Sequence, residues 1–419
     1  MSDEMRKFLG NLSWSFFGGV FASIAMLFVN VFGGRLMGPE QYGFYGLVLA
    51  ISQIIMLPAL FGMDTTGLHF LSKVQTREER AAHLTTMAVF VFFSSSVTFL
   101  LFFVAYSIFG HEFYPNLLLL AIAFAYTALA IFKSIVDIFF RGLSLFRDQF
   151  FSRMIEVALT VALFIIVVII LKKDSYTYYT FVLLTGYSGF ILYGLVHFKG
   201  YFSKFRFQIL KNQLSYAWIV VLGSLLGTAF NAMDKFIIAK YLSVQELGIY
   251  MAYFTASTNL IAQATQIFVN VYFPTISRIS DSSFIGKLDR IFLIGSIPIF
   301  LFLCLIIYLI MILFGGRYGQ DATYVVSFGF LALLQIVLTI YSSTIMALSK
   351  ELYKKYVIIF NIINVFHLIG YFILISLGKV SIIALVWMFV VNVSVAILFQ
   401  RWLIGKVKLG VYNGKIVRH

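Results

Sequence analysis

The polar side chains best placed to bind a solute recur at helical spacing in the apolar segment around Ile261. They are Thr255, Asn259, Ala262, Gln266 and Asn270, with Gln263 beside them. Residues at these intervals lie along one face of a helix, so the amides would form a polar stripe. Such a stripe can replace the hydrogen bonds that a polar solute loses when it leaves water. The alternative is that the amides join neighbouring helices by interhelical hydrogen bonds, and the sequence leaves both interpretations open.

A second stripe, in the preceding apolar segment, includes charged residues. Ser224, Thr228, Asn231 and Lys235 follow helical spacing, and Asp234 precedes Lys235 directly. A charge in the middle of a membrane costs about 3 kcal/mol or more unless it is paired or hydrated. Asp234 and Lys235 are therefore candidates for binding or for coupling to a cation.

Further charges lie close to apolar segments. We expect Arg35 and Lys240 at the outer ends of two of them and Asp64 near the inner end of another. Lys133 and Asp137 are four residues apart on one helix, which favours a structural ion pair over a site. Glu156 follows Arg153 by three residues, which favours a pair at the membrane interface.

Motifs for other kinds of chemistry are missing. The sequence contains no Gly-x-x-x-x-Gly-Lys-Ser/Thr loop and no His-Glu-x-x-His motif. Cys304 is the only cysteine, so a disulfide framework and a thiolate metal cluster are excluded. We expect a protein that is not an enzyme and that needs no cofactor and no metal.

The elements that must position these residues are membrane-spanning helices. Of the 419 residues, 61% are hydrophobic and 11% are charged, and the mean hydropathy is +0.96. A chain this apolar cannot make a water-facing surface, and each span needs about 20 apolar residues. About twelve runs qualify, which predicts an all-α polytopic membrane protein. The runs centre on Ala22, Ile54, Thr98, Ala128, Ala162, Ser188, Thr228, Ile261, Leu303, Leu334, Phe366 and Val391.

The basic residues predict the orientation of the chain in the membrane. Most of the 31 Lys and Arg residues fall in the loops that lie on the same side as the N-terminus. Cytoplasmic loops carry an excess of Lys and Arg, so both termini are predicted to be cytoplasmic. The same distribution accounts for the net charge of +14 without nucleic acid as a partner.

An internal repeat divides the chain. At a shift of 205 residues, the stretch from Arg35 to Tyr45 falls on the stretch from Lys240 to Tyr250, with a basic residue, a glycine and a tyrosine in common. The same shift aligns Gly18 with Gly223. We predict two related bundles of about six helices each, residues 1–205 and 206–419, around a central cavity.

These residues resemble a known family. The stretch Asn11-Leu12-Ser13-Trp14, the junction from Arg35 to Gly43 and the duplicated layout are similar to the polysaccharide transporter family, which includes O-antigen flippases of the Wzx type. Its superfamily also contains multidrug extruders and lipid II flippases. The resemblance covers essentially the whole chain.

The resemblance implies a flippase of the bacterial inner membrane. Its substrate would be an undecaprenyl-diphosphate-linked oligosaccharide, and its partners would be membrane lipids and other polysaccharide assembly proteins. Arg35, Lys235 and Lys240 would be the basic residues of the cavity, although Ser243-Val244 replaces Gly38-Pro39 in the second junction. The alternatives are a multidrug or small-solute antiporter, coupled to a cation through Asp64 or Asp234, and an O-antigen polymerase-like membrane enzyme.

Overall fold

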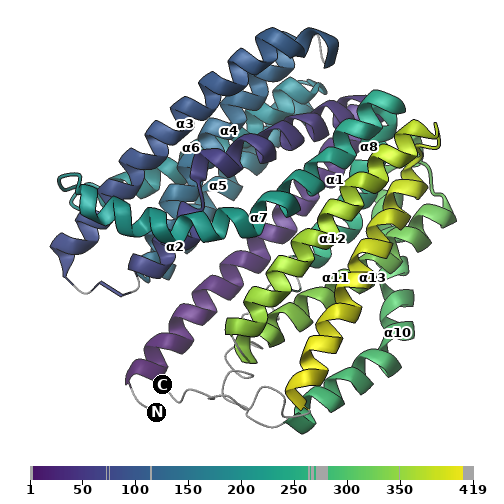
Figure 1. Ribbon diagram of the computed structural model, residues 1–419. Coiled ribbons are helices and arrows are strands. Elements are labelled where there is room, and N and C mark those ends of the chain that lie inside the picture. Colours follow the sequence, from purple (N-terminus) through teal and green to yellow (C-terminus); the bar gives the residue numbers. More distant parts are fainter. Residues whose placement is uncertain are drawn as a thin grey trace. The chain divides into compact units, whose positions relative to one another are not determined.

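The computed structural model in Figure 1 describes residues 3–71, 73–74, 76–113, 116–262, 265, 269, 282–348 and 350–408. Within these residues the regular secondary structure is entirely helical. The chain separates into two compact units, Met1–Lys240 and Tyr241–His419.

The first unit is built around a group of long helices. Its elements are α1 (Asp3–Leu60), α2 (Met63–Leu71), α3 (Arg77–Phe113), α4 (Leu117–Gly142), α5 (Phe146–Leu163), the π-helix η1 (Phe164–Ile170), α6 (Tyr176–Phe198) and α7 (Phe207–Tyr241). Helices α1, α4, α5 and α6 all pack against one another, and α3 packs against α1, α2 and α4. This arrangement brings side chains that are far apart in the sequence into one interior.

Helix α1 is broken at the predicted junction. Gly38 has φ 79° and ψ 168°, a conformation that glycine adopts readily and other residues rarely do. Pro39 follows, and a proline removes a backbone donor from the helix. The 58 residues of α1 therefore form two helical stretches that meet at Gly38.

The matching position in the second half breaks the helix by different chemistry. Ser243 has an extended backbone, and its side chain accepts a hydrogen bond from the backbone N–H of Glu246 at 3.0 Å, which caps the start of α8 (Val244–Phe254). Arg35 and Lys240 each lie three residues before the break in their half, and both are exposed. The two junctions thus lie at the same position of the repeat, although the residues that break the helix differ.

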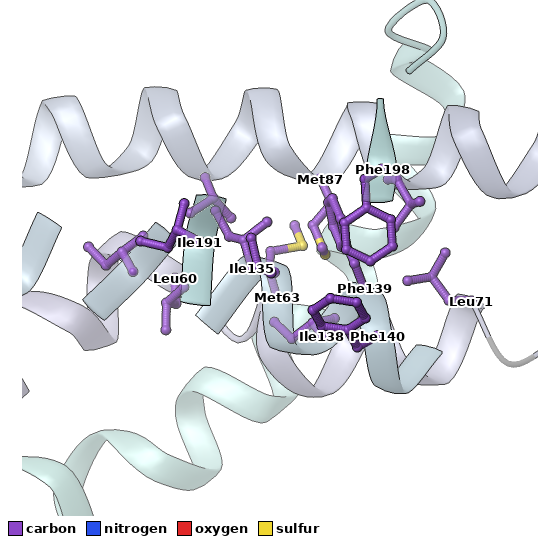
Figure 2. Close-up of a cluster of buried hydrophobic side chains, with 14 of the residues drawn as sticks. Leu60, Met63, Leu71, Met87, Ile135, Ile138, Phe139, Phe140, Ile191 and Phe198 are labelled. Atoms are coloured by element: carbon purple, nitrogen blue, oxygen red, sulfur yellow. The ribbon is translucent and has the colours of Figure 1, made fainter. Parts of the chain in front are cut away.

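A buried apolar cluster joins the elements at one end of the first unit (Figure 2). It includes Leu60, Met63, Leu71, Met87, Ile135, Ile138, Phe139, Phe140, Ile191 and Phe198. Small residues allow this packing, because a β-carbon at Gly142 would lie 2.8 Å from Leu71 and one at Gly67 would lie 2.9 Å from Ile138.

The segment between the two predicted halves is fixed to the first unit. The backbone N–H groups of Ser203 and Arg206 donate to the hydroxyls of Thr85 and Thr86 on α3, at 2.9 and 3.1 Å. Leu210 and Ala217, at the start of α7, belong to the apolar cluster of Figure 2. The compact first unit therefore extends to Lys240. The boundary between 205 and 206 rests on the repeat and stays a prediction about the two halves.

The second unit is a packed set of helices around α11. Its elements are α8, the π-helix η2 (Thr255–Asn259), α10 (Ser282–Phe314), the short 3-10 helix η3 (Gly316–Tyr318), α11 (Ala322–Leu348), α12 (Lys350–Ser376) and α13 (Ile382–Lys408). Helix α11 packs against α10, α12 and α13. Its core contains Ile340, Tyr341 and Ile345 of α11, which meet Tyr356 of α12 and Leu403 of α13.

The helices match the predicted spans. Each of the twelve predicted centres lies in a helix. Among the described residues, nine helical stretches are long and apolar enough to cross a membrane, or ten if the two parts of α7, which meet at 48°, form one span. The longest stretch, Gly18–Leu60, contains the break at Gly38 and holds the first two predicted spans. The short α2, which follows positive φ angles at Phe61 and Gly62, was not predicted.

Candidate functional site

The charged residues predicted on α7 are buried together. The ammonium nitrogen of Lys235 lies 3.2 Å from Oδ1 of Asp234, and the side chains are only 3% and 4% exposed. Lys235 also donates to the backbone carbonyl of Asn231, one turn earlier, and the Asn231 residue itself is exposed. The structure thus brings Asp234, Lys235 and Asn231 to one place and shows an ion pair between neighbouring residues.

The other predicted charges lie at helix ends. Arg35 precedes the break in α1, and Lys240 lies in the last turn of α7. Asp64 was expected within the second span, but it lies in the first turn of α2 and is exposed. The break at Phe61 and Gly62 separates Asp64 from the long helix that precedes it.

The predicted amide stripe falls largely outside the described residues. Gln263, Gln266 and Asn270 are not among them, and the side chain of Asn259 is not described. Thr255 is buried whereas Ala262 is exposed, although the predicted periodicity places both on one face. The π-helix η2 spans Thr255–Asn259, and a π-helix shifts the phase of the residues that follow it.

A charged cluster that the sequence did not indicate lies between α4 and α5. The ammonium nitrogen of Lys133 lies 2.5 Å from Oε1 of Glu156, and their side chains are 27% and 8% exposed. The expected pairing of Lys133 with Asp137 is wrong, because Asp137 instead contacts Arg153 at 3.3 Å and Arg141 at 3.7 Å. The expected pairing of Glu156 with Arg153 is also wrong. Spacing within one helix cannot reveal pairs between helices.

Aromatic hydroxyls adjoin this cluster. The hydroxyls of Tyr126 on α4 and Tyr187 on α6 are 2.8 Å apart, and Lys133 lies 4.1 Å from the centre of the Tyr187 ring. On α1, Tyr45 is within electrostatic range of both tyrosines. Lysine over an aromatic face is a cation–π contact, which stabilises the ammonium without neutralising it.

The second unit holds buried polar side chains that are uncharged, among them Asn364, Asn392 and Gln400. Nδ2 of Asn392 on α13 donates to Oδ1 of Asn364 on α12 at 3.3 Å, and Nε2 of Gln400 donates to the hydroxyl of Ser342 on α11 at 2.7 Å. A pocket of about 490 Å³ lies beside the first pair, between α12 and α13, and is lined by His367, Asn392 and apolar residues. These contacts fasten α11, α12 and α13 to one another.

The described residues contain no group of three His, Cys, Asp or Glu side chains that could hold a metal ion. That part of the chain therefore offers no metal centre. The predicted independence from cofactors stays a prediction.

Comparison with known proteins gives a family and a fold. A family model described as "Polysaccharide biosynthesis protein" matches residues 8–280. No curated protein matches the chain.

Solved structures similar to the chain include MATE transporters. An inward-facing multidrug resistance MATE family transporter of the MOP superfamily is 15% identical, with a TM-score of 0.63 over 93% of this chain and 96% of that chain. A MATE protein in complex with MaL6 is 14% identical, with a TM-score of 0.56 over 96% of each chain. At such low identity the likeness concerns the fold.

Proposed function

The chain belongs to the polysaccharide biosynthesis protein family, and on this premise we propose that it is a flippase for a lipid-linked oligosaccharide. The family match, over residues 8–280, is the observation that carries the proposal. The fold is that of the solved MATE transporters, and the predicted all-α, multi-pass membrane protein is confirmed. A transporter fold in a polysaccharide family favours movement of a glycan intermediate over its synthesis.

The proposed substrate is an undecaprenyl-diphosphate-linked repeat unit, turned over across the bacterial inner membrane by alternating access. A diphosphate and several sugars cannot enter hydrocarbon without hydrogen-bonding partners. Transfer of each unpaired polar group from water costs about 2 to 7 kcal/mol, and transfer of a charge costs far more. A flippase must offset that cost with cations and hydrogen-bonding groups. Both termini are proposed to be cytoplasmic, with membrane lipids and other polysaccharide assembly proteins as partners.

The proposed binding residues divide by chemistry. Lys235, Arg35 and Lys240 attract the diphosphate, and the amides Asn231, Asn259, Gln263, Gln266 and Asn270 contact the sugars. Lys235 is buried beside Asp234 in this structure, so its binding role requires a state of the transport cycle in which it is exposed. Asp234 is the first residue proposed to couple transport to a cation. Asp64, which is exposed, is the second.

The function is tested by deleting the gene and locating the glycan intermediate. The proposal expects surface glycan to disappear and the lipid-linked repeat unit to accumulate on the cytoplasmic face of the inner membrane. Restoration by the intact chain is the control. A deletion that leaves surface glycan unchanged but sensitises cells to toxic cations would contradict the proposal and favour a multidrug antiporter of the same fold.

We predict that Lys235→Ala lowers surface glycan at least about tenfold, because a charge-assisted contact with phosphate contributes about 1.5 to 3 kcal/mol. Lys235→Arg should retain much of the activity, since attraction to phosphate depends chiefly on charge. The measurement is surface glycan at matched protein level in the membrane, with Lys379→Ala, an exposed lysine between α12 and α13, as the control.

The competing account makes Lys235 a structural partner of Asp234. It expects Lys235→Ala to fold poorly and the double variant with Asp234→Asn to recover both protein and activity. Such a recovery, or full activity of Lys235→Ala, would exclude the binding role.

A further inference from the structure

The segment that leads from α6 into α7 alternates basic and aromatic side chains. We call residues 199–207 the linker segment. Its exposed aromatic side chains are Phe202, Phe205 and Phe207, at 56%, 44% and 70%. Its exposed basic side chains are Lys199, Lys204 and Arg206. No Asp or Glu occurs in the sequence from Lys199 to Met233, so the outside of this segment is both cationic and apolar.

The backbone of the linker segment is fixed to α3. The N–H groups of Ser203 and Arg206 donate to the hydroxyls of two threonines of α3, at 2.9 and 3.1 Å. Arg77, the first residue of α3, donates to the backbone carbonyl of Gly200 at 3.3 Å. Because α3 holds the backbone at three places, the exposed lysines and phenylalanines are displayed in one arrangement.

The exposed side chains of α3 show where this arrangement lies relative to the bilayer. Residues 77–79, at the start of the helix, are charged and exposed. Farther along, Val89 and Phe92 are apolar and 47% and 65% exposed. On a spanning helix, exposed charges lie in water and large exposed apolar groups lie against lipid. The boundary therefore crosses α3 between these two groups, in the interval that holds Thr85 and Thr86, the threonines bonded to the linker segment.

The helices on either side of the linker segment indicate the same level. At the end of α6, Val196 is 76% exposed, and the exposed Lys199 follows three residues later. At the start of α7, the exposed Lys211 is followed two turns later by Trp218, which is 54% exposed. Aromatic rings beside basic residues are typical of the membrane–water interface, where the rings lie at the level of the headgroups.

The orientation of the chain does not by itself explain this surface. An excess of Lys and Arg is expected in loops on the side predicted to be cytoplasmic. That rule requires neither exposed phenylalanines between the cations nor a backbone fixed to a neighbouring helix. Apolar rings gathered on an outer surface indicate a contact with another apolar phase. The combination fits a partner that is anionic at its surface and apolar just below it.

Two cations of the linker segment are available to such a partner. Arg206 lies 2.8 Å from Glu78 and is partly neutralised by it. Lys199 and Lys204 are exposed and, among the residues that the structure describes, take part in no ion pair. In addition, α7 begins at Phe207, and the positive end of a helix dipole favours an anion. These groups together attract phosphate.

We propose that the linker segment is a binding surface for anionic phospholipids of the leaflet that it faces. The phosphates of lipids such as phosphatidylglycerol contact Lys199 and Lys204, and the acyl chains lie beside Phe202 and Phe205. A lysine ammonium attracts phosphate through its charge, and the rings leave water when they enter the boundary between headgroups and acyl chains. The proposal concerns the membrane itself and holds whatever solute the chain transports.

The first experiment measures which lipid lies next to the linker segment. The reporter is the full chain with Phe205→Trp, in which the four native tryptophans are replaced by phenylalanine. In vesicles of phosphatidylcholine and brominated phosphatidylglycerol, bromine quenching gives the association constant of one lipid relative to the other. The reporter should prefer phosphatidylglycerol about fivefold or more, because each surface cation contributes about that factor. Lys199→Gln with Lys204→Gln should bring the ratio close to one, and an unchanged ratio would overturn the proposal.

Two further variants of the reporter separate a local surface from total charge. Lys172→Gln with Lys173→Gln removes two exposed lysines from the loop between η1 and α6 and is the matched control. It should leave the ratio as it was. A fall equal to that of the linker variant would overturn the proposal, since total charge would then determine the preference. Lys199→Arg with Lys204→Arg should keep the ratio, because both charges remain.

The second experiment tests whether the aromatic side chains enter the bilayer. A spin label is attached at Phe205→Cys in a chain that also carries Cys304→Ser, the change at the only native cysteine. Oxygen concentrates in hydrocarbon and a nickel chelate in water, so their collision rates with the label give its depth. Labels at Thr76→Cys, exposed before α3, and at Leu100→Cys, 62% exposed within it, calibrate water and hydrocarbon. The label at position 205 should lie between them. Accessibility to nickel equal to that at Thr76→Cys would overturn the proposal.

Discussion

The two units stabilise buried polar side chains by different means. The first unit pairs full charges between α4 and α5, as in Lys133 with Glu156. In the second unit, the described polar contacts between α11, α12 and α13 involve amides and hydroxyls, as in Asn392 with Asn364. The described part of the first unit thus joins α4 and α5 by charge pairs, and that of the second unit joins α11, α12 and α13 by uncharged hydrogen bonds.

The energetic consequences also differ. Removing one member of a buried ion pair leaves a charge without compensation and costs about 3 to 5 kcal/mol in proteins generally. Removing one member of a hydrogen-bonded pair within a membrane costs about 0.6 kcal/mol on average and up to about 1.7. The two units can therefore be compared by single substitutions in the same chain.

The largest loss of stability is expected from Lys133→Met. It leaves Glu156, the more enclosed member of the pair, without its cation, so the free energy of unfolding should fall by about 3 kcal/mol. Thermal unfolding in detergent measures the loss. A double variant, Lys133→Met with Glu156→Leu, should recover most of the stability. A double variant no more stable than the single one would contradict the account.

A smaller loss is expected in the second unit from Asn392→Ala. The change removes donors to Oδ1 of Asn364 at 3.3 Å and to the carbonyl of Ile363 at 3.4 Å. The free energy of unfolding should fall by about 1 kcal/mol in the same thermal measurement. Val391→Ala, an adjacent and 60% exposed position, is the control for truncation on α13. A loss at Asn392 as large as that of Lys133→Met would break the contrast between the units.

The smallest effect is expected at the surface of the first unit. Arg206 and Glu78 are 2.8 Å apart, but the Glu78 side chain is 80% exposed. Solvent screens such pairs, so Glu78→Gln should change the free energy of unfolding by about 0 to 1 kcal/mol, and less in high salt. The same thermal measurement at two salt concentrations checks it. A loss as large as that of Lys133→Met would show that charge alone, rather than burial, determines these energies.

Much of the fold was predictable because a membrane-spanning helix is determined by its own stretch of sequence. Each span must bond its own backbone groups in hydrocarbon, so a run of about 20 apolar residues is sufficient evidence for a helix. The helices at all twelve predicted centres follow from this rule. The break at Gly38 was predictable as well, because the Gly-Pro pair interrupts a helix by its own backbone chemistry.

The candidate site was predicted less well where the prediction depended on which residues share one face of a helix. The stripe from Thr255 to Asn270 assumed a continuous α-helix, and the π-helix at Thr255–Asn259 changes which residues share a face. A π-helix has no clear signal in the sequence. Asp64 was likewise displaced onto α2 by the positive φ of Phe61, a residue for which that conformation is unusual.

The sequence by itself determined three properties: that the chain is a membrane protein, which residues form the spanning helices, and to which family it belongs. It could do so because apolar runs and junction motifs are local properties. Only the tertiary structure decided which charges meet. Lys133 and Glu156 are 23 residues apart on different helices, and each had a nearer candidate partner in the sequence. Their pairing depends on how α4, α5 and α6 pack, which follows from the shapes of many side chains at once, including the missing side chain of Gly186.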